Sequence, residues 1–202
     1  MKKHLYAFCM LLTALTFSNL RGQIFEEGKS FVSVGYGIVG FSNSFFNDIL
    51  AGSEIDTRNF GPVYFKYEYA ISEKLGIGIG IANVNNSYTS TGTYTDNMGV
   101  SRNYTEKLSR SNTSILARLN WHFGENDRFD PYFGFGMGYR FGGWKYTVSD
   151  PAVGENEELP TVIPFGFELT TGARYFFTDN FGIYGEVGLA KSILQFGLTA
   201  NF

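Results

Sequence analysis

Large apolar residues that alternate with glycines dominate one stretch of this chain and limit what it can fold into. From Pro131 to Gly143 the sequence reads PYFGFGMGYRFGG. Side chains of a β-strand point alternately to its two faces. As a strand, this stretch carries Phe, Met and Tyr on one face and mainly Gly on the other, whereas a helix would not tolerate glycines at this spacing. The stretch therefore predicts a β-strand with one bulky apolar face and one nearly bare face.

The same alternation recurs along most of the chain and predicts eight strands. The connections between them read, in order, long, short, long, short, long, short and short. An even number of strands with alternating long and short connections is typical of barrels that cross a membrane. The predicted fold is therefore all-β, an eight-stranded antiparallel up-and-down transmembrane β-barrel. Its strands are expected at residues 30–41, 63–71, 75–82, 115–123, 131–143, 165–177, 181–189 and 194–202.

Two of the long connections have a distinctive composition. Residues 83–110 consist mainly of Asn, Ser, Thr, Tyr and Gly, and their tyrosines suggest strand extensions above a membrane. Residues 148–160 form an acidic loop that lacks the regular spacing of a calcium-binding loop. We interpret this loop as solvated and predict no metal site, although its carboxylates are the kind that bind hard cations: Asp150, Glu155, Glu157 and Glu158.

The first 22 residues have the order of an export signal. Lys2 and Lys3 precede an apolar run at residues 5–17, and small or polar residues follow before Gln23. We therefore predict a signal peptide at residues 1–22 and a barrel domain at residues 23–202. Removal of the signal takes away the one cysteine, Cys9, and lowers the basic count from 16 to 13 against 19 acids. A net charge near −6 offers no footprint for nucleic acid.

The volume of the side chains decides which face of the strands points outward. About seventeen aromatic residues lie on the apolar face, and an eight-stranded barrel is only just wide enough to be filled by ordinary side chains. The rings are therefore expected to face lipid, with the glycines and the few charges inside. The alternative, a soluble calycin-like ligand carrier, would have charged residues along the outer face of every strand.

Seven charged residues are predicted to point into the barrel. Buried charges persist only when they are paired and hydrogen-bonded, so Arg118 is expected between the carboxylates of Glu168 and Glu186. Arg140 is expected nearer the outside and Arg174 nearer the periplasm. Together the set predicts a charged plug across the waist: Lys66, Glu68, Arg118, Arg140, Glu168, Arg174 and Glu186.

The signal, the eight alternating strands and the ending Leu194-x-Phe-x-Leu-x-Ala-x-Phe202 resemble the small outer-membrane barrels of the OmpA, OmpX and OmpW type. The resemblance implies an integral protein of the outer membrane, surrounded by lipopolysaccharide and phospholipid. It also implies that the C-terminal strand, ending in Phe202, is the signal read by the outer-membrane assembly machinery.

No residue of the chain forms a convincing catalytic or cofactor site. His122 is the only histidine after the predicted signal, and we interpret it as an interfacial polar residue at the inner rim rather than a general base. We therefore predict no enzyme and no cofactor, but a structural or surface-interaction role in which the extracellular loops bind an unknown surface ligand. Two alternatives stay open: a small porin-like channel or carrier for small or apolar solutes, and an outer-leaflet lipid-modifying enzyme.

Overall fold

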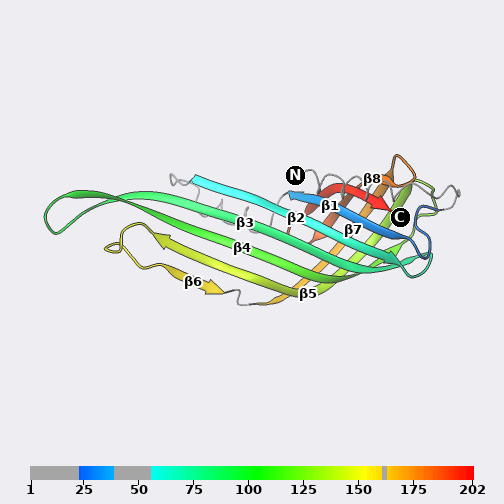
Figure 1. Cartoon of the computed structure of the whole chain (residues 1–202), viewed down its shortest axis with the longest axis horizontal. Helices are drawn as coiled ribbons and strands as arrows, with labels where there is room; N and C mark the ends of the chain where they lie inside the picture. The colour runs from blue at the N-terminus through cyan, green and yellow to red at the C-terminus, as the bar shows by residue number, and fades with distance from the viewer. Residues whose placement is uncertain (1–22, 39–55, 161–162) are drawn as a thin grey trace, which may run out of the picture.

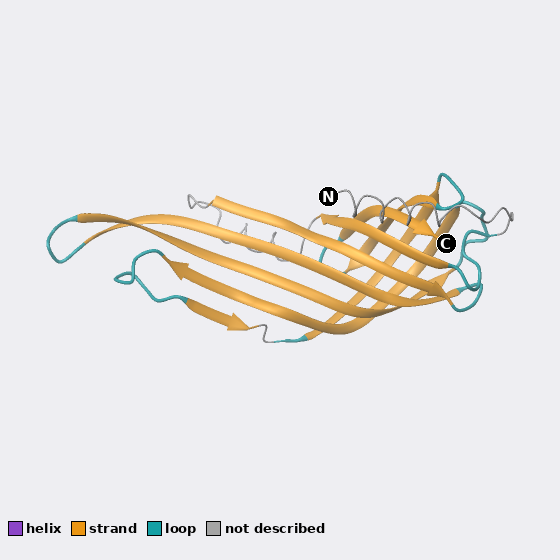
Figure 2. Cartoon of the chain, in the orientation of Figure 1, coloured by secondary structure: helices purple, strands orange, loops and turns teal. Residues whose placement is uncertain are grey.

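The computed structural model describes residues 23–38, 56–160 and 163–202. The predicted signal and most of the first external connection lie outside these residues. Within them, eight antiparallel strands form a closed barrel and a ninth, β6, lies beyond it (Figures 1 and 2). None of the described residues forms a helix long and apolar enough to cross a membrane. The strands are β1 (Ser30–Ile38), β2 (Asp56–Ala70), β3 (Leu75–Thr95), β4 (Ser101–His122), β5 (Phe129–Val148), β6 (Glu157–Pro160), β7 (Phe165–Phe176), β8 (Phe181–Leu189) and β9 (Leu194–Asn201).

The eight barrel strands follow one another around the wall in the order of the sequence. Each pairs with its neighbours along the chain, β5 pairing with β7, and β9 returns to pair with β1 from Phe31↔Asn201 to Ile38↔Leu194. This last pairing closes the sheet, so none of the eight strands keeps a free edge along its whole length. The predicted eight-stranded up-and-down barrel is confirmed.

The barrel has one short wall and one long wall. We call the end that carries the C-terminus and the turns after β2, β4 and β7 the inner end, and the opposite end the outer end (Figure 1). β3 has 21 residues and β8 has nine, so β3 is roughly 40 Å longer at about 3.3 Å per residue. The excess projects from the outer end as a sheet extension, which we define as residues 83–110 of β3 and β4 with the paired parts of β5 and β6.

The long connection at residues 83–110 consists of the strand extensions that its tyrosines suggested. Residues 83–110 are strand except for a turn between Thr95 and Ser101, and they pair without interruption. The acidic connection after β5 also contains a strand, because β6 pairs with β5 from Gly143↔Pro160 to Tyr146↔Glu157. Polar residues on both faces of these strands, such as Asn86 and Ser87 on β3, obscured the apolar alternation that marks a strand.

The two faces of the barrel wall have the predicted character. Outward apolar side chains such as Ile79, Phe135 and Met137 are each exposed by more than 40 %. Inward glycines leave space for long side chains: a Cβ on Gly136 would lie 3.4–3.5 Å from Glu168, Arg118 and Leu116. The glycines are therefore what allows charged side chains to fit inside so narrow a barrel.

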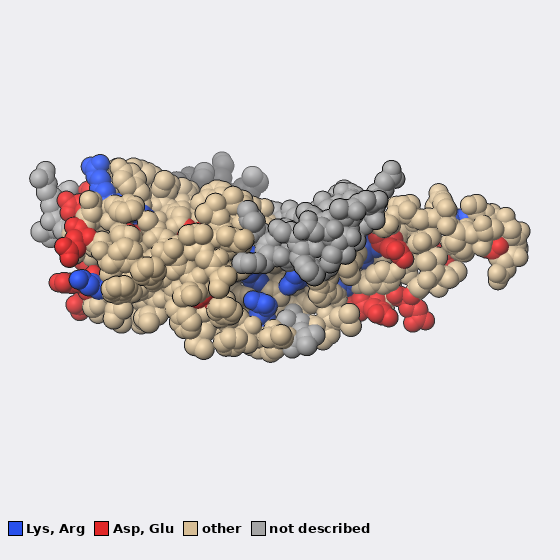
Figure 3. Space-filling model, turned by 180° about the vertical axis from the view of Figure 1, so that it is seen from behind, with Lys and Arg blue, Asp and Glu red and all other residues tan. Residues whose placement is uncertain are grey.

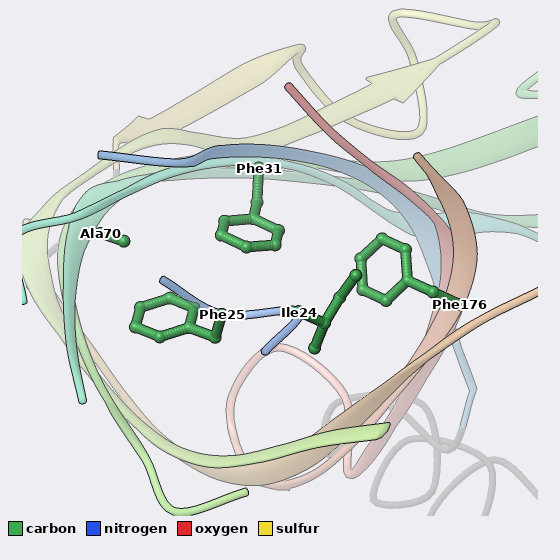
Figure 4. Packing of buried hydrophobic residues seen from close by; sticks show 5 residues of the cluster. All are labelled: Ile24, Phe25, Phe31, Ala70 and Phe176. Carbon is green, nitrogen blue, oxygen red and sulfur yellow. The ribbon is translucent and has the colours of Figure 1, made fainter. Parts of the chain in front are cut away.

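An apolar cluster fills the inner end of the lumen (Figure 4). Ile24 and Phe25 precede β1 and pack inside the ring of strands with three residues of the wall, Phe31, Ala70 and Phe176. The chain after Phe25 is held to β2, because the amide of Gly28 donates to the Ala70 carbonyl at 2.9 Å. We call these five residues the inner plug. No sequence pattern predicted it, since it lies in a segment without strand alternation.

Candidate functional site

Arg118 is the centre of a buried ionic layer at the waist of the barrel. Its Nη1 pairs with Glu168, and its Nη2 lies 3.1 Å from Oε1 of Glu186. Lys66 donates from Nζ to Oε2 of Glu186 at 2.6 Å, and the Tyr132 hydroxyl donates to Oε1 at 2.7 Å. These side chains come from five strands, so the layer spans the lumen from wall to wall.

A second ionic layer lies between the first and the inner plug. Arg174 pairs with Glu68 and, at 3.4 Å, with Asp130. His122 contacts the same two carboxylates, with Nε2 2.7 Å from Glu68 and Nδ1 2.7 Å from Asp130. Both ring nitrogens donate at once only in the imidazolium form. With His122 charged, four cations face four carboxylates across the two layers.

Little space remains among these side chains. The cavity that they enclose with Phe31 and Tyr132 has a volume of about 10 Å³, roughly what one water molecule needs. On the inner side, the Phe25 ring stacks on the His122 ring with 3.5 Å between centroids. Ionic layers and inner plug therefore form one continuous packing along the lumen.

The structure brings six of the seven predicted lumen charges together and leaves out the seventh. Arg140 forms no ion pair within the described residues and lies closer to the outer end. His122 is not at the rim as predicted but is buried, with 1 % exposed. Asp130, which lies just before the predicted strand at residues 131–143, is an inward residue of β5. Its alternation with Tyr132 and Gly134 was the signal that could have placed it.

Phe202 lies at the seam between the first and last strands. Its amide donates to the Ser30 carbonyl at 3.0 Å, and its carbonyl accepts from the Ser30 amide at 2.9 Å. Its ring is exposed by 56 %. The assembly role of this residue stays a prediction.

A cleft of about 820 Å³ opens above the ionic layers, along the inner face of the extension. β3, β4, β5 and β6 supply its walls, in which small polar residues and glycines are combined with Arg110, Trp144, Lys145, Glu158, Leu159 and Pro160. Arg110 lines the cleft, and its guanidinium carbon lies over the Trp144 ring, 5.1 Å from the ring centroid. Seen from behind, the molecule shows blue Lys and Arg atoms in a hollow between barrel and extension (Figure 3).

Comparisons with known proteins agree with this architecture. The family described as outer membrane protein beta-barrel domain matches residues 7–199. No curated protein sequence matches the chain.

Three solved structures illustrate the similarity. Ail of Yersinia pestis, in complex with the heparin analogue sucrose octasulfate, shares 15 % identity with a TM-score of 0.49, covering 87 % of this chain and 99 % of that one. The N-terminal barrel of Pseudomonas aeruginosa OprF shares 16 % (TM-score 0.40; 88 % and 98 % covered). OprG from the same organism shares 11 % (TM-score 0.42; 91 % and 99 % covered).

Proposed function

The chain belongs to the outer membrane protein β-barrel domain family and is integral to the outer membrane, and from this we propose that it is a closed, non-conducting barrel whose sheet extension interacts with partners at the cell surface. The termini of such barrels lie in the periplasm, so the outer end faces the outside of the cell. The barrel wall contacts lipopolysaccharide and phospholipid, and Phe202 is proposed as the signal for the assembly machinery.

The sheet extension is the observation that carries this proposal. Its strand β3 is roughly 40 Å longer than β8 of the short wall, far more than is needed to close a barrel in the bilayer. Among the described residues, β3 beyond Thr89 pairs only with β4, and we propose that its other edge presents backbone groups that an extended partner chain can pair with. A rigid, polar sheet held above the membrane is suited to recognition, because its surface is ordered before a partner arrives.

The packed lumen argues against the channel alternative. Its two ionic layers are buried and hydrogen-bonded, and the cavity between them is the size of one water molecule. A continuous water path would require at least one of these ion pairs to open. The lipid-enzyme alternative is also disfavoured, because both nitrogens of His122 are held by carboxylates and neither is free to act as a base.

Two measurements test the proposal. Purified full-length protein in planar bilayers is expected to show no steady conductance, and large stable channels from the monomer would refute the closed lumen.

Separately, residues 90–101 are replaced by a two-residue turn, and cells that display either form are compared on arrays of matrix proteins and glycans. The shortened protein is expected to keep its heat-modifiable gel migration and to lose binding. Equal binding by both forms would refute a role for the extension.

A further inference from the structure

Three cations gather where the lumen meets the outer cleft. Arg110 on β4 and Arg140 on β5 alternate in register with the inward residues of those strands, opposite Trp144 and Ser114 respectively. Lys191 comes from the turn between β8 and β9 on the other side of the mouth. Its Nζ donates to the Asn112 backbone carbonyl at 3.1 Å and also to the Asn112 side chain. We call these three residues the mouth cluster.

The mouth cluster has no anion of its own within the part of the chain that the structure describes. None of its members forms an ion pair there, and Nε of Arg140 is buried without a hydrogen-bond partner. The lumen carboxylates are already paired in the layers below, and buried Leu116 lies on β4 between Arg118 and the mouth. Three neighbouring positive charges without a counterion are costly when partly removed from water.

The charges of the cluster act on one another. Burial, followed by the positive charges of Arg140 and Arg110, lowers the pKa of Lys191 to about 7. Bringing an anion among the three groups would remove this repulsion. The cluster is therefore arranged as a site that gains stability when a negatively charged group enters it.

The cleft above the cluster suits a saccharide that carries such a group. Its volume of about 820 Å³ lies within the usual range for small-molecule sites. Among its lining residues, Asn86, Arg110 and Trp144 share the inward register, and their neighbours along β3 and β4 are small or polar, namely Asn85, Ser87, Ser109 and Ser111. An aromatic ring offers a packing face for a sugar, polar groups bind its hydroxyls, and guanidinium groups bind phosphate or sulfate with two parallel hydrogen bonds.

We propose that the outer mouth binds an anionic saccharide, with the phosphate or sulfate group held by Arg110, Arg140 and Lys191 and the sugar lying in the cleft. The inference rests on the proposed function in one respect, the outward orientation of the extension, and it names a ligand class for that surface. Such a group occurs on the lipopolysaccharide of the same membrane and on soluble glycans.

Binding of simple sugars tests the chemistry. Full-length protein in phospholipid nanodiscs is titrated with glucose 6-phosphate, glucose 6-sulfate and glucose, by calorimetry and by Trp fluorescence. Both charged sugars are expected to bind and glucose is not. Arg140→Gln and Lys191→Gln are each expected to weaken binding at least tenfold, whereas Lys107→Gln, on the exposed face of β4, leaves it unchanged. All variants must keep heat-modifiable migration; if Arg140→Gln does not fold, Lys191→Gln carries the test alone.

The pH dependence adds a readout specific to the cluster. Lys191 loses its charge as the pH rises through about 7, whereas a guanidinium group is not deprotonated in proteins. Affinity for glucose 6-sulfate, whose own charge is constant, is therefore expected to fall between pH 6 and pH 9, and this fall is absent in Lys191→Gln. An equal fall in the variant would contradict the assignment of Lys191.

Further measurements distinguish lipopolysaccharide from soluble glycans as the source of the saccharide. They also test whether carboxylates of the chain itself occupy the site. If nanodiscs with lipid A suppress sugar binding and nanodiscs with dephosphorylated lipid A do not, the ligand is the membrane's own saccharide; if neither suppresses it, the ligand is soluble. Equal binding of glucose and the charged sugars overturns the proposal. Asp48 and Glu54 belong to the connection between β1 and β2. If the charged sugars bind only after Asp48→Asn and Glu54→Gln, the proposal is also overturned, because carboxylates of the chain itself would then be the occupants of the site. Conductance and array binding do not enter these measurements, so failure here is distinct from failure of the proposed function.

Discussion

Removing the guanidinium of Arg118 is the sharpest test of the ionic packing. Arg118 is 4 % exposed in its side chain and is the one ion-pair partner of Glu168 among the described residues. In Arg118→Met, Glu168 stays buried without a counterion, whereas Glu186 keeps Lys66 and Tyr132. Breaking a buried pair from one side costs roughly 3–5 kcal/mol. We therefore expect the free energy of unfolding to fall by about this amount.

The assay is urea unfolding of the full chain in lipid vesicles, followed by gel migration and by Trp fluorescence. Lys145→Met is the matched control, because its pair with Glu158 is more than half exposed on both sides and such pairs contribute about 1 kcal/mol or less. Adding Glu168→Gln to Arg118→Met removes the unpaired charge and is expected to restore at least half of the loss. A loss below about 1 kcal/mol for Arg118→Met, or additive effects in the double variant, would refute the reasoning.

Three further predictions concern the wall, the inner plug and the edge of the extension. Ile79→Arg places a charge toward lipid and is expected to lower the free energy of unfolding by about 2–4 kcal/mol in the same assay. Gly136→Ala, whose Cβ meets neighbours at ordinary distances, is expected to lower it less. The reverse order would show that the inward and outward faces are assigned the wrong way round. Phe25→Ala removes a buried ring and is expected to lower the free energy of unfolding by about 3–5 kcal/mol, while Glu27→Ala, at an exposed position, is neutral. If Phe25→Ala is as stable as the unaltered protein, the inner plug does not support the barrel. Thr93→Pro, beyond the part of β3 that pairs with β2, is expected to abolish array binding without loss of barrel stability, and unchanged binding would exclude this edge as the contact.

The barrel was predictable because its wall separates two environments. Lipid on one side and a narrow lumen on the other impose a period of two on every strand, and PYFGFGMGY shows that period in nine consecutive residues. Where both faces carry mainly polar residues, as in Asn85–Thr95 of β3, the apolar period disappears although the strand continues. Alternation therefore predicted the part of each strand inside the membrane, whereas the extension was indicated only by the tyrosines of residues 83–110.

The inner plug shows a second limit. Ile24 and Phe25 are two apolar residues in a segment without regular secondary structure, and their burial depends on the ring of strands that surrounds them. Contacts of this kind arise only when distant parts of the chain meet. A local pattern cannot indicate them, whereas inward alternation could indicate Asp130.

Arg118 and Arg140 show most clearly how depth decides the role of a residue. Both are inward arginines on adjacent strands, and alternation treats them alike. At the depth of Arg118 the facing strands supply Glu168 and Glu186; at the depth of Arg140 the short wall has ended, and its turn brings Lys191 toward Asn112 instead of a carboxylate. Among the described residues, charge balance is thus complete where the lumen is packed and incomplete where it opens. The unequal height of the wall, which no local pattern encodes, separates the arginine that is paired in the lumen from the arginine that we propose binds a ligand.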